Sequence, residues 1–129
     1  MSAEKTKRSV DLLRRALDRL EEALAEPASN PLAVDGTIQR FEFAFELTWK
    51  ALKHALEEEG LAVGTPRDAL KRAYAAGWFD DEAAWLGMLS DRNQTSHTYN
   101  EETATRIYAS IRRNFPEMRR LHGVLAARA

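Results

Sequence analysis

The sequence predicts an all-α fold, a single domain over residues 1–129 built as an antiparallel bundle of four or five helices. Apolar residues recur at intervals of three and four along most of the chain, which is the period of an amphipathic helix. No segment alternates polar and apolar residues as a half-buried strand does. Short connectors with proline or glycine separate the periodic segments, and such connectors favour antiparallel neighbours.

Two helices are predicted in the first half of the chain. The first ends near Pro27, and a connector containing Pro31 follows it. Its apolar stripe consists of Val10, Leu13, Leu17, Leu20 and Leu24. The second covers about Asp35 to Glu59. Its main stripe consists of Ile38, Phe41, Phe45, Trp49, Leu52 and Leu56. Phe43 and Leu47 lie off this stripe, so the helix has two apolar faces, which suit sister helices and a second subunit.

The third helix has the clearest start in the chain. Thr65 can cap it, Pro66 suits its first position, and Gly77 marks its exit. A fourth helix is predicted to start at Asp80 or Asp81 and to run into a polar stretch. Its core side chains are Trp85, Leu86, Met88 and Leu89.

A fifth helix follows, with Asn100 as its predicted cap. Its stripe consists of Ile107, Ile111, Phe115, Met118, Leu121 and Leu125. Pro116 should kink or restart this helix. The segment Ala104 to Ala129 has six arginines and one glutamate, a net charge of +5, whereas Asp35 to Gly60 sums to -3. This asymmetry could steer RNA or a partner protein toward one end, or it could be an ordinary solvated helix face.

Composition excludes several classes of protein. Nineteen basic and twenty acidic residues give a net charge of -1, which argues against a general coat for nucleic acid or membrane surfaces. Any anion site must therefore be local. The absence of cysteine removes disulfides and thiolate chemistry. No signal peptide or membrane span is recognisable, so a cytoplasmic protein without membrane contact is expected.

The polar stretch Ser90–Asn100, "SDRNQTSHTYN", contains no aliphatic side chain. On a straight helix Asn93 and His97 share a face, whereas Arg92 and His97 diverge by about 140°. Arg92 and His97 could converge in three ways. The helix could loosen near Ser96, the arginine side chain could wrap round, or two copies of the helix could face each other across a dimer.

Arg92 and His97 would suit phosphate chemistry in such a cleft. The guanidinium offers a planar fork of donors for phosphate oxygens, and a histidine can move protons near neutral pH. Asn93 could orient the histidine ring or hold a phosphate. No cofactor is needed, and the three histidines lack metal-ligand spacing, so no metal is expected. The plain alternative is that Arg92 forms an ion pair and His97 complements a helix dipole.

Glu42 and Glu46 form a second candidate group on the second helix. They lie on one side of it together with Trp49 and Lys53, and a paired-carboxylate site is conceivable. The alternative is an edge of ordinary salt bridges, either solvated or between helices. These carboxylates could also contact Arg92 across the bundle and hold its guanidinium in place.

A family resemblance joins these features. The segment "RNQTSHTY" resembles the Arg-x4-His-x-Tyr motif of HEPN domains, and "DRNQTSHTYNEETA" is similar to their nucleotidyltransferase substrate-binding branch. The likeness extends to "IQRFEFAFELTWKALKHALEEEG", "TPRDALKRAYAAGWFDD" and "AAWLGML", and covers about Ile38 to Ile111. The order of these blocks is more specific than any one of them.

The resemblance implies a helical homodimer encoded beside a minimal nucleotidyltransferase (MNT) with which it associates. It also implies two functions: a substrate-binding subunit for that enzyme, or a metal-independent ribonuclease toxin that the enzyme silences, as in toxin–antitoxin pairs. Arg92 matches the phosphate-binding arginine, His97 the catalytic histidine, Asn93 the polar residue after the arginine, and Tyr99 the tyrosine that receives AMP. RNA or a nucleotide would be the ligand, and DNA is not expected.

Two plainer readings remain beside the resemblance. Tyr99 could be a half-buried aromatic residue before the Asn100 cap, with its hydroxyl reaching water. The whole chain could be a helical scaffold without chemistry of its own.

Overall fold

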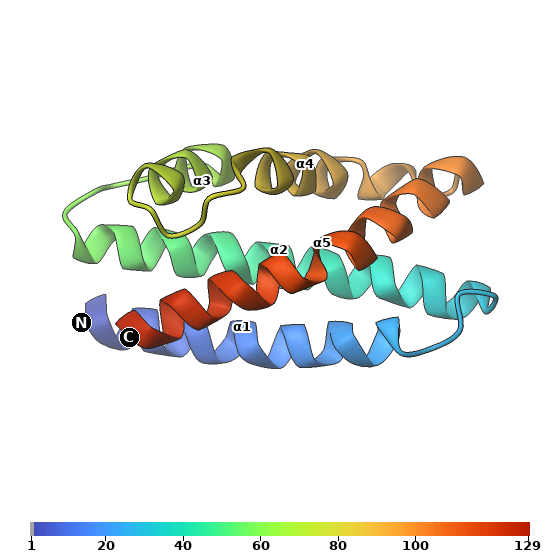
Figure 1. Ribbon diagram of the computed structural model, residues 1–129, viewed down its shortest axis with the longest axis horizontal. Coiled ribbons are helices and arrows are strands. Elements are labelled where there is room, and N and C mark those ends of the chain that lie inside the picture. The colour runs from blue at the N-terminus through green and yellow to red at the C-terminus, as the bar shows by residue number, and fades with distance from the viewer. Residues whose placement is uncertain (1) are drawn as a thin grey trace.

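Five α-helices and one short 3₁₀ turn make up the computed structural model, which describes residues 2–129 (Figure 1). The elements are α1 (Ser2–Leu24), α2 (Pro31–Glu58), α3 (Pro66–Ala75), α4 (Glu82–Asn93), η1 (Thr95–His97) and α5 (Glu101–Arg128). No strand occurs in this part of the chain, which confirms the all-α bundle. No helix within residues 2–129 combines the length and apolar character that crossing a membrane requires.

The long helices α1 and α2 lie side by side, and α5 crosses both of them (Figure 1). The two short helices, α3 and α4, follow one another along the other side of α2. The start of α1 and the end of α5 therefore lie at one end of the bundle, while the junction from α4 through η1 to α5 lies at the opposite end. That junction contains the polar stretch.

Local capping explains where most helices begin. The side chain of Thr65 accepts a hydrogen bond from the Asp68 amide at 3.1 Å, and Asn100 accepts one from the Thr103 amide at 3.2 Å. Asp81, rather than Asp80, caps α4. These interactions satisfy amides that have no partner inside the helix.

One predicted boundary is wrong, and of the two effects predicted for Pro116 the restart does not occur. The α2 helix begins at Pro31 instead of about Asp35, because Asn30 caps it and Pro31 occupies its first position. The α5 helix continues through Pro116 to Arg128 without restarting. A proline removes one backbone hydrogen bond, and buried Met118 and Leu121 hold the following turns on the core.

The predicted apolar stripes form the core where α1, α2 and α5 meet. Leu13, Leu17 and Leu20 are fully buried, as are Phe41 and Phe45. Trp85 is fully buried as well, on α4. The second apolar face of α2 remains open within this chain. Phe43 is 58% exposed and lies outside the core, whereas Leu47 is half-buried and packs against the edge of the core.

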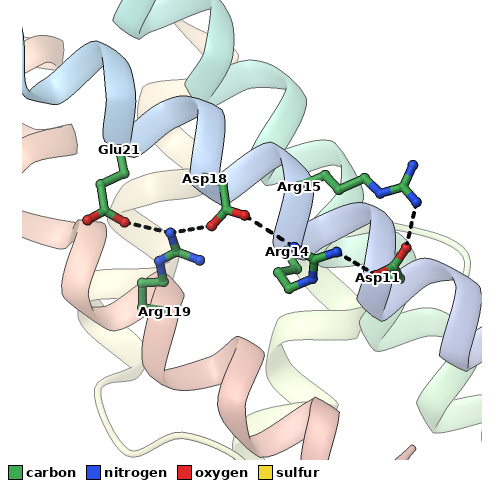
Figure 2. A network of polar contacts seen from close by, with 6 residues as sticks. All are labelled: Asp11, Arg14, Arg15, Asp18, Glu21 and Arg119. Carbon is green, nitrogen blue, oxygen red and sulfur yellow. Dashed lines mark hydrogen bonds and ion pairs between the residues drawn. The ribbon is translucent and has the colours of Figure 1, made fainter.

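Ion pairs fasten α1 to α5 along the edge of the core (Figure 2). Arg119 lies 2.7 Å from Asp18 and 2.6 Å from Glu21, while Arg14 bridges Asp11 and Asp18 on α1 itself. Arg119 lowers the pKa of Asp18, chiefly through this hydrogen bond. Arg119, one of the six arginines in the last segment, is therefore engaged inside the molecule and contributes less to steering a ligand.

Burial of His122 between α1 and α5 makes the stability of the fold depend on pH. Desolvation lowers the pKa of this side chain below its usual 6.5. Well above pH 6.5 the side chain is neutral in the folded and the unfolded state, and as the pH falls the unfolded state gains the proton before the folded state does. We expect the free energy of unfolding, measured with urea, to fall between pH 7 and pH 5, and to fall less in His122→Leu. An unchanged slope in the variant would refute this assignment.

Candidate functional site

The polar stretch ends one helix and starts the next. The α4 helix stops at Asn93, the η1 turn follows, and Asn100 caps α5. The hydroxyl of Thr95 donates to the Arg92 carbonyl at 2.8 Å, and that of Thr98 donates to the Thr95 carbonyl at 3.1 Å. Because such side chains compete with backbone partners, they terminate helical structure. The helix therefore does loosen before Ser96, as one of the three predicted arrangements requires, but no contact between Arg92 and His97 results within the described chain.

Arg92 is held from across the bundle by Glu46. The guanidinium lies 3.5 Å from one carboxylate oxygen, and the indole of Trp49 donates to the other oxygen at 2.6 Å. Arg92 also donates to the side chain of Asn93 at 3.5 Å. Both partners of the Arg92–Glu46 pair are about one-third exposed, at 36% and 34%. The guanidinium is thus oriented on one side and open to an anion on the other.

His97 and Tyr99 form a separate, solvent-facing pair. Their rings meet edge to face with centroids 6.2 Å apart. Tyr99 is 86% exposed, so the reading of a half-buried packing residue is wrong. Tyr99 lines two shallow hollows, and Glu42 lines the one that also includes Gln39. Glu42 and Glu46 are therefore placed beside Tyr99 and Arg92, respectively.

The two groups stay separate within one chain. Among residues 2–129, no hydrogen bond or ring contact joins Arg92 to His97. A bound phosphate or a second copy of the chain would have to connect them. The described residues also contain no group of three or more histidine, aspartate or glutamate side chains arranged to hold a metal ion.

Asp91 is a site residue that the sequence reading missed. Its carboxylate is 7% exposed, accepts a 2.5 Å hydrogen bond from Ser110, and lies 3.0 Å from Arg106. Arg106 also donates to Gln94 at 2.6 Å. These contacts fasten the end of α4 and the polar turn to α5. The sequence does contain a sign of this role: Asp91 follows Met88 by three residues, which places its carboxylate on the same face of α4 as the apolar core residues.

Comparison with known proteins agrees with this architecture. The family described as "Nucleotidyltransferase substrate binding protein like" matches residues 8–127. The chain is similar to a probable ribonuclease HepT from Haemophilus influenzae, with 37% identity over 84 residues. That alignment covers 60% of this chain and 57% of the relative, so it spans little more than half the relative's length.

Two solved structures share the fold over 90% of this chain. A crystal structure from Thermus thermophilus is 37% identical, with a TM-score of 0.76 and 97% of its own chain covered. A protein from Haemophilus influenzae is 28% identical, with a TM-score of 0.80 and 98% of its chain covered. Its structure is described as revealing the fold of a substrate binding domain of a nucleotidyltransferase.

Removing the Asp91 carboxylate should loosen the site before it affects the rest of the bundle. We expect Asp91→Ala to lower the free energy of unfolding by about 2 kcal/mol, since a buried hydroxyl and part of a guanidinium lose a charged partner. Asp91→Asn should cost less because its amide oxygen still accepts from Ser110. Urea denaturation measures both values. Equal, negligible losses in the two variants would show that the contact with α5 is dispensable.

Proposed function

The chain belongs to the family of nucleotidyltransferase substrate binding protein like domains, and from this membership we propose that it is the binding subunit of a separately encoded minimal nucleotidyltransferase. One observation carries the proposal. Arg92 is oriented by Glu46 yet keeps about one-third of its side chain exposed beside Asn93. A fixed, accessible guanidinium fork is the group that binds nucleotide or RNA phosphates in two-point contacts.

Tyr99 is the residue that we propose as the acceptor of AMP from the partner enzyme. Its hydroxyl oxygen would attack the α-phosphorus of ATP, pyrophosphate would leave, and the hydroxyl proton would pass to water. Its exposure of 86% and the two hollows that it lines give a second protein access to the ring. The added nucleotide would then occupy the space next to His97 and block it.

The test combines binding with covalent modification. We expect the purified protein and the nucleotidyltransferase encoded beside it to co-elute, and magnesium with ATP to add one AMP mass to this chain. Tyr99→Phe should abolish the addition, whereas Tyr74→Phe, at a tyrosine that is 42% exposed on α3, should leave it intact. Intact mass spectrometry distinguishes the cases. An equal mass shift in wild type and Tyr99→Phe would move the acceptor elsewhere.

A metal-independent ribonuclease is the second candidate function, supported by the exposed His97 and by the relative described as a probable ribonuclease. His97 would take the proton of a ribose 2′-hydroxyl, whose oxygen then attacks the adjacent phosphorus. The bond to the 5′-oxygen breaks, and a second histidine returns a proton to that oxygen. We propose a homodimer, in which His97 of the second copy supplies that proton and Arg92 stabilises the phosphorane charge.

RNA cleavage in EDTA tests the ribonuclease candidate. His97→Ala should lose roughly two to four orders of magnitude in rate, the usual share of acid and base catalysis. Arg92→Lys should retain part of the activity that Arg92→Ala loses, because lysine keeps the charge without the fork. Circular dichroism checks that each variant is helical, and light scattering checks for the dimer.

Three outcomes would contradict the ribonuclease mechanism. Loss of wild-type cleavage in EDTA would exclude metal-free chemistry. Full activity in His97→Ala would identify a contaminating nuclease. If the wild-type protein does not cleave RNA but binds its nucleotidyltransferase, only the substrate-binding function remains. If it neither cleaves RNA nor binds the enzyme, it fits a helical scaffold.

A further inference from the structure

A groove between α1 and α2 remains outside the functions assigned so far. Four apolar side chains line it: Leu12, Ala16, Phe43 and Leu47. Leu12 is 40% exposed and Phe43 is 58% exposed, and the groove has a volume of about 470 Å³. A large aromatic side chain that faces water beside other apolar groups indicates a protein contact. We name this feature the α1–α2 groove.

The charged side chains that line the α1–α2 groove are all arginines: Arg15, Arg19 and Arg40. Arg40 is fixed by a 2.6 Å hydrogen bond to the Arg19 carbonyl and lies 3.6 Å from Glu22. Arg15 lies 3.2 Å from Asp11 on its own helix, at an exposed pair, whereas among residues 2–129 no ion pair involves the Arg19 side chain. The groove therefore combines an apolar floor with a positive rim, and it is complementary to an apolar surface edged by carboxylates.

Gly36 lies in the wall of the α1–α2 groove, six residues into α2. A Cβ atom built there meets no atom within 4 Å, and the residue does not have a positive φ. Nothing inside the chain therefore requires glycine, although glycine weakens a helix relative to alanine. The bare backbone lets a second helix approach α2 more closely than a side chain would.

A second copy of this chain is a poor occupant of the groove. In a two-fold symmetric dimer centred on Phe43, the three groove arginines of one chain would face the same three arginines of the other chain. Like charges across an interface oppose association. The groove also adjoins the candidate site, because Gln39 lines both the groove and the hollow beside Tyr99. A protein docked in the groove would thus lie next to that tyrosine.

We propose that the α1–α2 groove docks an amphipathic helix of the nucleotidyltransferase subunit, with large apolar side chains on one face and carboxylates at its edges. This inference rests on the proposed function and specifies which surface of the chain the enzyme uses. Phe43 and Leu47 pack against the apolar face, and Arg15 and Arg19 pair with the carboxylates. Docking there positions the enzyme beside Tyr99.

Calorimetric titration of the complete chain tests the groove with two probes. One probe is the purified nucleotidyltransferase encoded beside the chain. The other is a synthetic amphipathic helix with leucine on one face and glutamate on the other, and its lysine counterpart is the control peptide. We expect the enzyme and the glutamate peptide to bind, more weakly as salt increases, and the lysine peptide not to bind.

Three variants test the residues of the groove. Arg19→Glu and Phe43→Ser should each weaken binding of both probes at least tenfold, because one reverses the rim charge and the other removes the aromatic anchor. Gly36→Gln should do the same by filling the groove, yet its helix should be at least as stable, which separates lost docking from lost folding. The matched control is Arg67→Glu, which reverses an exposed arginine on α3 outside the groove.

The outcomes separate this inference from the proposed function. If the enzyme binds and none of the groove variants weakens it, the partnership stands and the groove assignment is wrong. If the enzyme fails to bind but the acidic peptide binds and responds to the variants, the groove chemistry stands and the partnership falls. If neither the enzyme nor the peptide binds, the inference is overturned. It is also overturned if Phe43→Ser converts a dimer to a monomer in light scattering.

Discussion

The buried carboxylate of Asp91 is the group on which the geometry of the candidate site depends. It lies where α4 ends, and its contacts with Ser110 and Arg106 join that end to α5. Through Arg106 the same connection reaches Gln94 in the polar turn. A buried charge is tolerated only when it is paired and hydrogen-bonded, so this carboxylate strongly restricts where the turn can lie.

The contrast between two arginines follows from that restriction. Arg106 is committed to the molecule, because it contacts a carboxylate that is 7% exposed and also donates to Gln94. Arg92 contacts Glu46 at a longer 3.5 Å, and both side chains in that pair keep about one-third of their surface exposed. Exposed pairs contribute little to stability, so an anion can compete for the Arg92 guanidinium at small cost. Arg106 therefore stabilises the geometry of the site, and Arg92 remains available for binding.

Local chemistry in the sequence predicted much of the fold. Thr65 and Asn100 were recognised as caps because capping depends on residues three positions away, and the apolar stripes followed from their period. Pro31 was misplaced because a proline suits both a connector and a first helical turn. The contact of Arg92 with Glu46 and the role of Asp91 depend on how α2, α4 and α5 pack. Those partners are 15 to 46 residues apart, so no local pattern specifies them.

The outward surface of α2 connects the two surfaces proposed for the partner enzyme. Glu46 points to Arg92, Glu42 lines the hollow beside Tyr99, and Gln39 lies between that hollow and the α1–α2 groove. An AMP group on Tyr99 would bring a phosphodiester charge into a hollow that already contains the carboxylates of Asp35 and Glu42. Like charges would repel it from that side, while the open guanidinium of Arg92 would attract it. Modification would then place the nucleotide over the proposed phosphate-binding group, so that the residue proposed to bind a phosphate would hold the group that blocks it.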